Sequence, residues 1–392
     1  MKLFKKLLII LTSIILIFGI AVFVIWGNEI GTIASIKSVI PRNDENNQGV
    51  VFDMDVKGDY YFDDFLAQGG VKNDVQLISF MMDNITKGII PIKMQGPDIG
   101  CSAFTAKTAE GDMILARNYD FDPTSSAIIS TNPSESMRSF STVDLSFIDL
   151  DTSKDEYGLV DKAKMIANAY APLDGINEAG LAVGIFMTYQ GEETTATDQN
   201  TTRDDLTSTT MIRLILDKAT TVSEAVELVK EYDLHDSANT SFHYMIADAT
   251  GKSAVLEWVY GTDSTDNDGT KRELVVTYND DDADIGLNEG EAEYQWITNF
   301  ILTPDYYESD EEKAGLDRYN LIYEELAKRD GVVADEKDAL SILQAVGRRN
   351  FGTGSNAYTI HSVVFNLTKK TATWVFNENF DKTDEIITKD FN

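Results

Sequence analysis

The stretch from Gly100 to Asp122 constrains the fold most, because it joins a hairpin pattern to the only cysteine of the 392-residue chain. An alternating run begins at Cys101, a turn signal follows at Gly111, and a second apolar run ends at Arg117. Two such runs joined by a short glycine-containing turn predict a β-hairpin. Cys101 starts one strand and Arg117 ends the other, so the pattern places a thiol beside a cation.

The N-terminus predicts a membrane anchor. Three lysines among the first six residues precede an uncharged run from Leu7 to Trp26, and as a helix this run of about 20 residues spans roughly 30 Å, the thickness of a bilayer core. The lysines keep the N-terminus in the cytoplasm and export the rest. A cleavable signal peptide, with an apolar region of about 7 to 15 residues, is the alternative. The length favours a single-pass protein of the cell membrane with an extracytoplasmic body, and the alternative is a secreted protein.

In either case Cys101 faces an oxidising space, where a single cysteine has no intramolecular disulfide partner. A buried, inert cysteine is the alternative interpretation, and it is common in cytosolic proteins. The export signal therefore favours a reactive thiol.

Composition and charge narrow the function classes. Hydrophobic residues make up 43% of the chain and aromatic residues 10%, which is enough to bury a sizeable core. The formal net charge of −32 argues against a nucleic-acid partner and against electrostatic binding to anionic lipids.

The order of patterns divides the chain into three parts. Residues 1–29 are the anchor or signal, residues 30–100 are a tether and a segment that is either propeptide-like or a small domain, and residues 101–392, which begin with the thiol, are expected to be the catalytic domain. The segment before Cys101 contains a helical pattern over 75–85.

After the hairpin, strands and helices alternate in blocks. Strands are predicted at 143–148, 181–187, 242–248, 253–260, 274–278, 358–365 and 371–376. Helices are predicted at 207–216 and 221–232, from Arg318 onward, and at 335–346. Antiparallel strand pairs around blocks of helices indicate an α+β fold with layers.

A catalytic thiol needs a base that removes its proton. Histidine is the usual base, but His243 and His361 lie inside predicted strands, where a core role is favoured, and no papain-like pattern surrounds Cys101. A cysteine at the start of a mature chain can use its own α-amino group, which has a pKa of about 7.7 to 8.0. This solution requires cleavage after Gly100.

At this point the sequence resembles the cysteine N-terminal nucleophile hydrolases of the linear amide C–N hydrolase group. That group includes choloylglycine hydrolases, penicillin V acylases, acid ceramidase and N-acylethanolamine acid amidase, with the isopenicillin N acyltransferases as relatives. Five motifs occur in the order of this family between Cys101 and about Phe376. They are the Cys101 hairpin ending in Arg117-Asn118-Tyr119-Asp120, the turn Gly175-Ile176-Asn177-Glu178-Ala179-Gly180-Leu181, the stretch from His243 to Gly251 with Glu257, the run Thr298-Asn299-Phe300, and the helix start Asp317-Arg318-Tyr319.

The resemblance implies an αββα sandwich of two antiparallel sheets between helical layers. It implies that Cys101 is the nucleophile, that Arg117 holds the thiol in its reactive state and that Asp120 orients the freed amine. Asn299 together with Asn177 would stabilise the oxyanion, and Arg318 would complete the polar network near Cys101. By themselves, Asn177 is equally explained as a turn residue and Arg318 as an ordinary residue at a helix start.

The implied reaction is hydrolysis of the amide bond of a small N-acyl compound after self-cleavage at Gly100–Cys101, with no cofactor and no metal. The substrate classes are conjugated bile acids, N-acyl amines or amino acids, and penicillin V type side chains. An acyltransferase is the alternative within this class, and a non-catalytic, surface-anchored binding protein is the alternative outside it. Residues 122–142 and 188–206 are predicted to be the loops that determine specificity.

Overall fold

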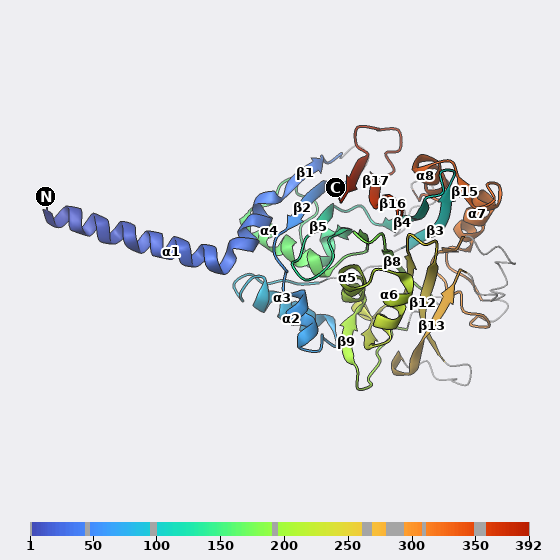
Figure 1. The fold of residues 1–392 in the computed structure, drawn as a ribbon, viewed down its shortest axis with the longest axis horizontal. Helices are drawn as coiled ribbons and strands as arrows, with labels where there is room; N and C mark the ends of the chain where they lie inside the picture. Colours follow the sequence, from blue (N-terminus) through green and yellow to red (C-terminus); the bar gives the residue numbers. More distant parts are fainter. Residues whose placement is uncertain are drawn as a thin grey trace.

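The computed structural model describes residues 2–43, 48–94, 100–189, 195–260, 269–279, 294–307, 311–348 and 358–391. Figure 1 shows a body of packed sheets and helices, from which the long N-terminal helix α1 (Lys2–Ser35) extends. The other helices are α2 (Phe62–Ala67), α3 (Asp74–Asn84), α4 (Leu159–Met165), α5 (Ser208–Lys218), α6 (Val222–Val229), α7 (Leu316–Ala327) and α8 (Glu336–Ala345).

The larger sheet has nine strands in the described residues. Neighbouring strands in it are antiparallel, except β2 and β5, which run parallel. In order across the sheet they are β1 (Lys37–Ile40), β2 (Val51–Val56), β5 (Ser126–Thr131), β6 (Ser139–Asp144), β7 (Asp174–Asn177), β8 (Ala182–Met187), β11 (Phe242–Ala247), β12 (Ser253–Tyr260) and β13 (Arg272–Tyr278).

The smaller sheet contains the predicted hairpin. Its seven described strands are β14 (Trp296–Ile297), β3 (Gly100–Thr108), β4 (Met113–Phe121), β16 (Tyr358–Asn366), β17 (Thr371–Phe376) and β18 (Ile387–Asp390), with β15 (Val332–Val333) beside β3. Strands β3 and β4 pair from Gly100↔Asp120 to Lys107↔Met113, and Gly111 takes the positive φ of 94° that the turn requires. The hairpin prediction is therefore confirmed.

The two sheets face each other through side chains of their central strands. Arg117 of β4 forms an ion pair with Asp174 of β7. The indole Nε1 of Trp374 in β17 donates a hydrogen bond to Thr142 Oγ1 in β6 at 2.8 Å. The core of the molecule and the region around Cys101 lie between these two sheets.

Helices cover the outer faces of both sheets. On the larger sheet, the Tyr244 hydroxyl of β11 donates to the Ser208 carbonyl of α5 at 3.1 Å. On the smaller sheet, Asn118 Nδ2 of β4 donates to the Leu343 carbonyl of α8 at 2.8 Å. The α+β class is confirmed, and the layers follow the order helix, sheet, sheet, helix.

Helices begin where their capping residues predict. Thr221 accepts a hydrogen bond from the Glu224 amide and caps α6, and Asp335 accepts one from the Asp338 amide and caps α8. The predicted helix at 221–232 ends earlier than expected, because the chain from Tyr232 forms β10 (Tyr232–His235), which pairs in parallel with β9 (Asp204–Thr207).

Two local predictions after the hairpin are wrong. The predicted strand at 143–148 ends at Asp144, and Leu145–Ile148 form a 3₁₀ turn capped by the Asp144 side chain. The predicted specificity loop at 122–142 contains β5 and most of β6. Alternation is weak there because both strands are buried on both faces, so periodicity did not reveal them.

The segment before Cys101 belongs to the same folded body. Strand β2 lies inside the larger sheet, paired with β1 on one side and β5 on the other. Phe65 of α2 and Phe80 of α3 pack with their ring centroids 5.8 and 5.9 Å from that of Tyr170. Residues on both sides of Gly100 therefore form one core.

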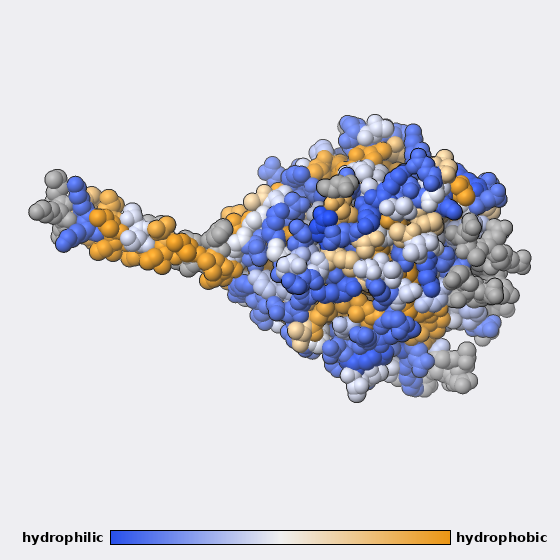
Figure 2. All heavy atoms as spheres, viewed as in Figure 1, coloured by the Kyte–Doolittle hydropathy of each residue, from blue (hydrophilic) through white to orange (hydrophobic). Residues whose placement is uncertain are grey.

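Helix α1 carries the predicted apolar run. Figure 2 shows apolar residues along it, and Leu7, Ile9 and Ile17 are exposed. None of the helices in the described part of the chain meets the length and hydropathy needed to cross a membrane. The predicted membrane-spanning helix over 7–26 is thus not supported.

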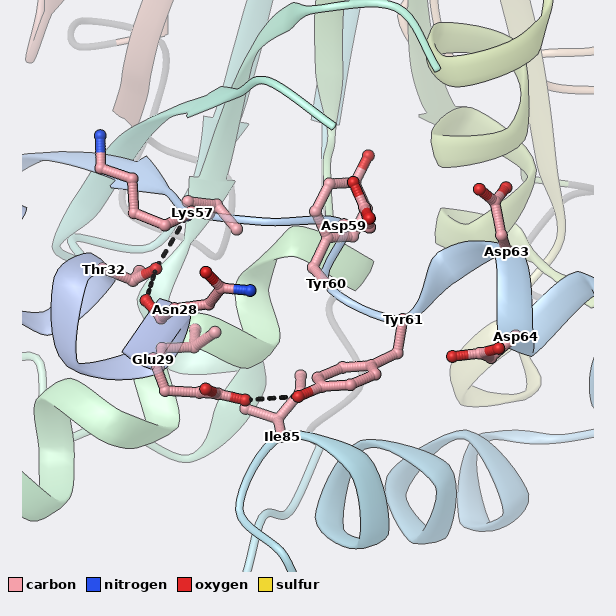
Figure 3. A pocket seen from close by; sticks show the side chains of 12 residues that line it. Asn28, Glu29, Thr32, Lys57, Asp59, Tyr60, Tyr61, Asp63, Asp64 and Ile85 are labelled. Atoms are coloured by element: carbon pink, nitrogen blue, oxygen red, sulfur yellow. Dashed lines mark hydrogen bonds between the residues drawn. The ribbon is translucent and has the colours of Figure 1, made fainter. Parts of the chain in front are cut away.

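The base of α1 is fixed to the body at a pocket of about 270 Å³ (Figure 3). There Glu29 accepts a hydrogen bond from the Tyr61 hydroxyl at 2.7 Å, and Thr32 Oγ1 accepts one from the Lys57 amide at 2.9 Å. None of the predicted site residues lines this pocket.

Candidate active site

The backbone and the side chain of Cys101 are held by three different side chains. Its amide donates to Asn299 Oδ1 at 2.9 Å, and its carbonyl accepts from Arg318 Nη1 at 2.6 Å. Its sulfur accepts from Arg117 Nη2 at 3.4 Å. Cys101 is fully buried, so the surrounding protein determines the chemistry of its thiol.

Arg117 reaches the sulfur because of strand alternation. Cys101 and Arg117 lie on the face of the hairpin that points to the larger sheet, where Arg117 Nη2 also donates to the Ile185 carbonyl at 2.8 Å. Gly184 makes room for this side chain, since a Cβ there would lie 2.9 Å from Arg117 Cδ. The predicted proximity of Cys101 and Arg117 is confirmed.

The Cys101 thiol is protonated in the continuous chain. Burial raises its pKa to about 11, because a thiolate would lose its hydration there. The guanidinium groups of Arg117 and Arg318 act in the opposite direction, and the Asp120 carboxylate adds to the rise. Attack by this sulfur therefore requires a base close by.

Asp120 lies on the other face of the hairpin, opposite Gly100 in the strand register. Its carboxylate accepts from Thr359 Oγ1 at 2.7 Å and from Arg318 Nη1 at 3.2 Å. Burial raises the pKa of this carboxyl. Asp120 is part of the predicted network, although the Cys101 amide donates to Asn299 rather than to Asp120 in the continuous chain.

Asn299 and Arg318 come from distant parts of the sequence and meet at Cys101. Arg318, in the first turn of α7, donates from Nη2 to Asn299 Oδ1 at 2.8 Å. Asn299 Nδ2 donates to the Met187 carbonyl at 2.7 Å. Since an amide nitrogen carries two hydrogens, Met187 uses only one of them.

The loop that carries Asn299 is fixed by a buried pair that the sequence analysis did not assign to the site. His243 contacts Glu257 Oε1 through Nδ1 at 3.0 Å and the Thr298 carbonyl through Nε2 at 2.9 Å. The Glu257 carboxylate also accepts from the amides of Leu302 and Thr303 at 2.7 and 2.8 Å. These bonds hold the residues on both sides of Asn299.

The structure does not bring Asn177 to Cys101, and this corrects the prediction. Asn177 Nδ2 donates to the carbonyls of Leu216 and Ala219 at the end of α5, at 3.1 and 2.8 Å. Its Oδ1 accepts from the amides of Ala179 and Leu181 in its own turn. Asn177 points to the helix on the outer face of the larger sheet, so it has no place in an oxyanion site at Cys101.

Two other buried residues join the site instead. Asp174, three residues before Asn177, forms the ion pair with Arg117, and His361 Nε2 lies 2.7 Å from Asp174 Oδ2. The acidic residue directly precedes the quoted turn motif, but only its face in the strand determines its partner. No sequence signal distinguished His361 from a core histidine.

Within the described residues, no group of three or more histidine, cysteine or acidic side chains is arranged to hold a metal ion. The donors around Cys101 are mainly guanidinium and amide groups. This set suits an anionic oxygen or a thiolate better than a cation.

Comparisons with known proteins give one family and several structures. The sequence model of the family described as acyl-coenzyme A:6-aminopenicillanic acid acyl-transferase matches residues 107–381. No curated protein matches the sequence.

Three solved structures illustrate the structural similarity. A mutant of conjugated bile acid hydrolase from Clostridium perfringens is 17% identical, with 74% of this chain and 92% of that chain covered and a TM-score of 0.48. Penicillin V acylase from Agrobacterium tumefaciens is 14% identical, with 70% and 83% covered and a TM-score of 0.40. The Caenorhabditis elegans orthologue of N-acylethanolamine-hydrolyzing acid amidase is 16% identical, with 68% and 93% covered and a TM-score of 0.42.

Proposed function

We propose that this chain, which belongs to the acyl-coenzyme A:6-aminopenicillanic acid acyl-transferase family, is an amidohydrolase that takes the acyl group of a linear N-acyl amide onto Cys101 and releases it to water. The arrangement around Cys101 carries this proposal. Its amide, carbonyl and sulfur are each bound by a different polar side chain at a fully buried position. A cysteine that only fills space in a core needs none of these partners.

The first step is self-cleavage at Gly100–Cys101. The sulfur attacks the Gly100 carbonyl and the thiol proton passes to the Cys101 nitrogen, so that the C–N bond breaks and the acyl group moves from nitrogen to sulfur. Water then cleaves the thioester, which leaves a carboxyl group on Gly100 and a free α-amino group on Cys101. This amine, with a pKa of about 7.7 to 8.0, is then the base that the buried thiol lacks in the continuous chain.

In the cleaved enzyme each neighbour has a distinct task. Arg117 stabilises the thiolate, and Asp120 accepts a hydrogen bond from the new amine. The second amide hydrogen of Asn299 donates to the oxyanion of the tetrahedral intermediate. Arg318 holds Asn299 Oδ1 and the Cys101 carbonyl in place.

Cleavage also explains how a substrate reaches the sulfur. Cys101 is fully buried in the continuous chain, so an amide cannot approach it. Breaking the bond between Gly100 and Cys101 lets Gly100, which is buried next to Cys101 in β3, move away from the sulfur. The substrate is a small N-acyl amide, in the classes of N-acyl amines, N-acyl amino acids, conjugated bile acids and amides with penicillin V type side chains.

A transferase is the second candidate, and the description of the matching family favours it. In that case an amine instead of water takes the acyl group from Cys101. The two reactions share the thioester, so the ratio of hydrolysed to transferred product at increasing amine concentration separates them.

Intact mass, N-terminal sequencing and turnover of an N-acyl amide panel test the proposal in three variants. Wild type is expected to yield a fragment that begins at Cys101 and to hydrolyse at least one amide. Cys101→Ala is expected to stay uncut and inactive. Ser102→Ala is the matched control, since the neighbouring hydroxyl has no hydrogen-bond partner among the described residues, and it is expected to behave as wild type. An uncut wild type that turns over, or a Cys101→Ala variant that is cut and active, would contradict the proposal and favour another nucleophile. A wild type that is neither cut nor active would contradict it as well and favour the binding-protein alternative.

A further inference from the structure

Arg117 is clamped on the side away from the sulfur. Its Nη1 donates to Asp174 Oδ2, and its Nη2 lies between the Ile185 carbonyl at 2.8 Å and Cys101 Sγ at 3.4 Å. Arg117 and Asp174 are both fully buried. The direction in which the guanidinium points is therefore determined by one carboxylate oxygen together with the Ile185 carbonyl.

That oxygen has a second donor. His361 Nε2 lies 2.7 Å from Asp174 Oδ2 and 3.4 Å from Arg117 Nη1, while His361 Nδ1 has no partner among the described residues. A neutral ring with its proton on Nε2 fits both observations, because it donates to the carboxylate and leaves no buried N–H unpaired. Burial lowers the pKa of His361, which is consistent with the neutral form.

A β-bulge places His361 in this position. Thr359 pairs with Asp120 and His361 with Tyr119, so Ile360 is an extra residue in β16. Without the bulge, Thr359 and His361 would share a face, since they are two apart in a strand. With it, Thr359 donates to Asp120 on one face while His361 contacts Asp174 on the other.

We propose that Asp174 and His361 are positioning residues, which together hold the Arg117 guanidinium against the Cys101 sulfur. His361 shares the charge of the Asp174 carboxylate, so that Arg117 remains available to the sulfur instead of being drawn fully into its ion pair. This inference rests on the proposed function in one respect only: that function explains why the orientation of Arg117 matters.

The other titratable groups near Cys101 have partners outside the Arg117–Asp174–His361 cluster. Arg318 and Asp120 act on the sulfur from the opposite face of the hairpin. Tyr119, which stands between Cys101 and His361 in the strand register, donates to Asp144 at 3.0 Å. None of these groups changes in the variants below.

The test compares His361→Phe with His361→Gln. The phenylalanine keeps a ring but has no donor, and the glutamine restores an N–H near the place of Nε2. We expect the pH midpoint of Cys101 ionisation to rise by about one unit in His361→Phe, which lowers the thiolate fraction about tenfold below the midpoint. His361→Gln is expected to recover most of this loss.

The midpoint is measured without turnover. Cys101 is the only cysteine, so iodoacetamide labelling of cleaved protein followed by intact mass reports on one atom. Ultraviolet absorbance of the thiolate, read as the difference from a matching Cys101→Ser protein, gives the same midpoint in cut or uncut chains. Failure of the proposed hydrolase function therefore leaves this test valid.

The matched control is Ser362→Ala in the same strand. The Ser362 hydroxyl donates to Asn118 Oδ1 at 2.7 Å, which lies on the opposite face, so its loss costs a buried hydrogen bond without touching Arg117. We expect an unchanged midpoint. An unchanged midpoint in His361→Phe, or a His361→Gln protein that behaves like His361→Phe, would overturn the inference.

Asp174→Asn gives a second test, because a positioning role and a purely electrostatic role of Asp174 shift the pH midpoint of Cys101 in opposite directions. If Asp174 affected the sulfur only through its own negative charge, the substitution would lower the midpoint. If it positions Arg117, the midpoint rises. A lowered or unchanged midpoint overturns the proposal, and this variant serves where His361→Phe does not fold.

Discussion

After cleavage at Gly100–Cys101, the leading fragment, meaning the chain before Cys101, is expected to stay bound to the rest of the protein. Its strand β2 hydrogen-bonds along β5, which belongs to the other fragment. Its aromatic side chains are buried against that fragment as well. They are Phe52, beside Tyr157, and Tyr60, Phe62, Phe65 and Phe80, which all contact the Tyr170 ring.

The binding free energy of the leading fragment can be approximated from this burial. Each of the five rings contributes about 1.5–3 kcal/mol, or about 7–15 kcal/mol together. Association of two chains costs about 4–15 kcal/mol, which is close to the contribution of the rings. The β2–β5 ladder and the other buried side chains of the leading fragment add binding free energy beyond that cost, and this net binding free energy is called the surplus below. Dissociation in native buffer is therefore not expected.

Phe65→Ala measures the surplus. Phe65 has no exposed surface, and its ring centroid lies 5.2 to 5.8 Å from those of Phe80, Phe62 and Tyr170. Loss of such a ring costs about 3–5 kcal/mol, which raises the dissociation constant of the leading fragment about 10²- to 10⁴-fold. Val75→Ala, at a side chain that is 75% exposed, is the matched control in the same fragment and should change little.

Size-exclusion chromatography of the cleaved protein in rising urea, with gels of each fraction, provides the measurement. Wild type and Val75→Ala should release the leading fragment at the same urea concentration, and Phe65→Ala at a lower one. Separate elution of the two wild-type fragments in native buffer would refute the reasoning. Equal urea dependence of wild type and Phe65→Ala would refute it as well.

Three further predictions concern single side chains. Asn299→Asp keeps an oxygen for the Cys101 amide but removes the amide donor, so kcat/KM of the active enzyme should fall about 10²- to 10³-fold; an unchanged value in steady-state kinetics contradicts the oxyanion role. The Cys101 pKa of about 11 in the uncut chain predicts that the thiolate absorbance of uncut protein, read as the difference from Cys101→Ser, rises about tenfold per pH unit between about pH 7 and pH 10, and a plateau within that range contradicts it. Burial raises the pKa of Asp236 from 3.8 to about 6, so its contribution to stability is present below pH 3.8 and is lost as the pH rises through 6. Asp236→Asn, which does not titrate, should therefore gain on wild type by up to about 3 kcal/mol between about pH 4 and pH 7; a constant difference in unfolding free energy from urea titrations contradicts this.

Local patterns in the sequence predicted most of the elements that build the site. The hairpin from Cys101 to Arg117 is confirmed because alternation and a turn glycine act over a few residues. Helix α7 was predicted from the apolar spacing after Arg318, and α8 from a similar pattern. The order of the motifs also predicted that Asn299 and Arg318 belong to the same site as Cys101, and both contact its backbone.

Long-range pairing is what the sequence did not reveal. Residues 51–56 form β2, the second strand from one edge of the larger sheet, although the sequence pattern predicted only a tether and a propeptide-like segment there. Their partner β5 was interpreted as part of a loop. A parallel pair separated by almost seventy residues of chain leaves no local signal in either strand, because register depends on what each face packs against.

The motif predicted Asn177 as a site residue, but the structure places Asp174 there instead, which shows why a motif alone cannot assign a site residue. Both lie in the four-residue strand β7, and residues three apart in a strand point to opposite faces. A Cβ at Gly175 would lie 2.8 Å from Leu216 of α5, so Gly175 and Asn177 face the helix, and Asp174 faces Arg117. The asparagine therefore caps the carbonyls at the end of α5, and the acidic residue enters the site. The same short strand therefore contacts a helix on one face of the sheet and positions the guanidinium partner of the thiol on the other. A polar residue of this motif is consistent with either task until it is known which face of the sheet its side chain lies on.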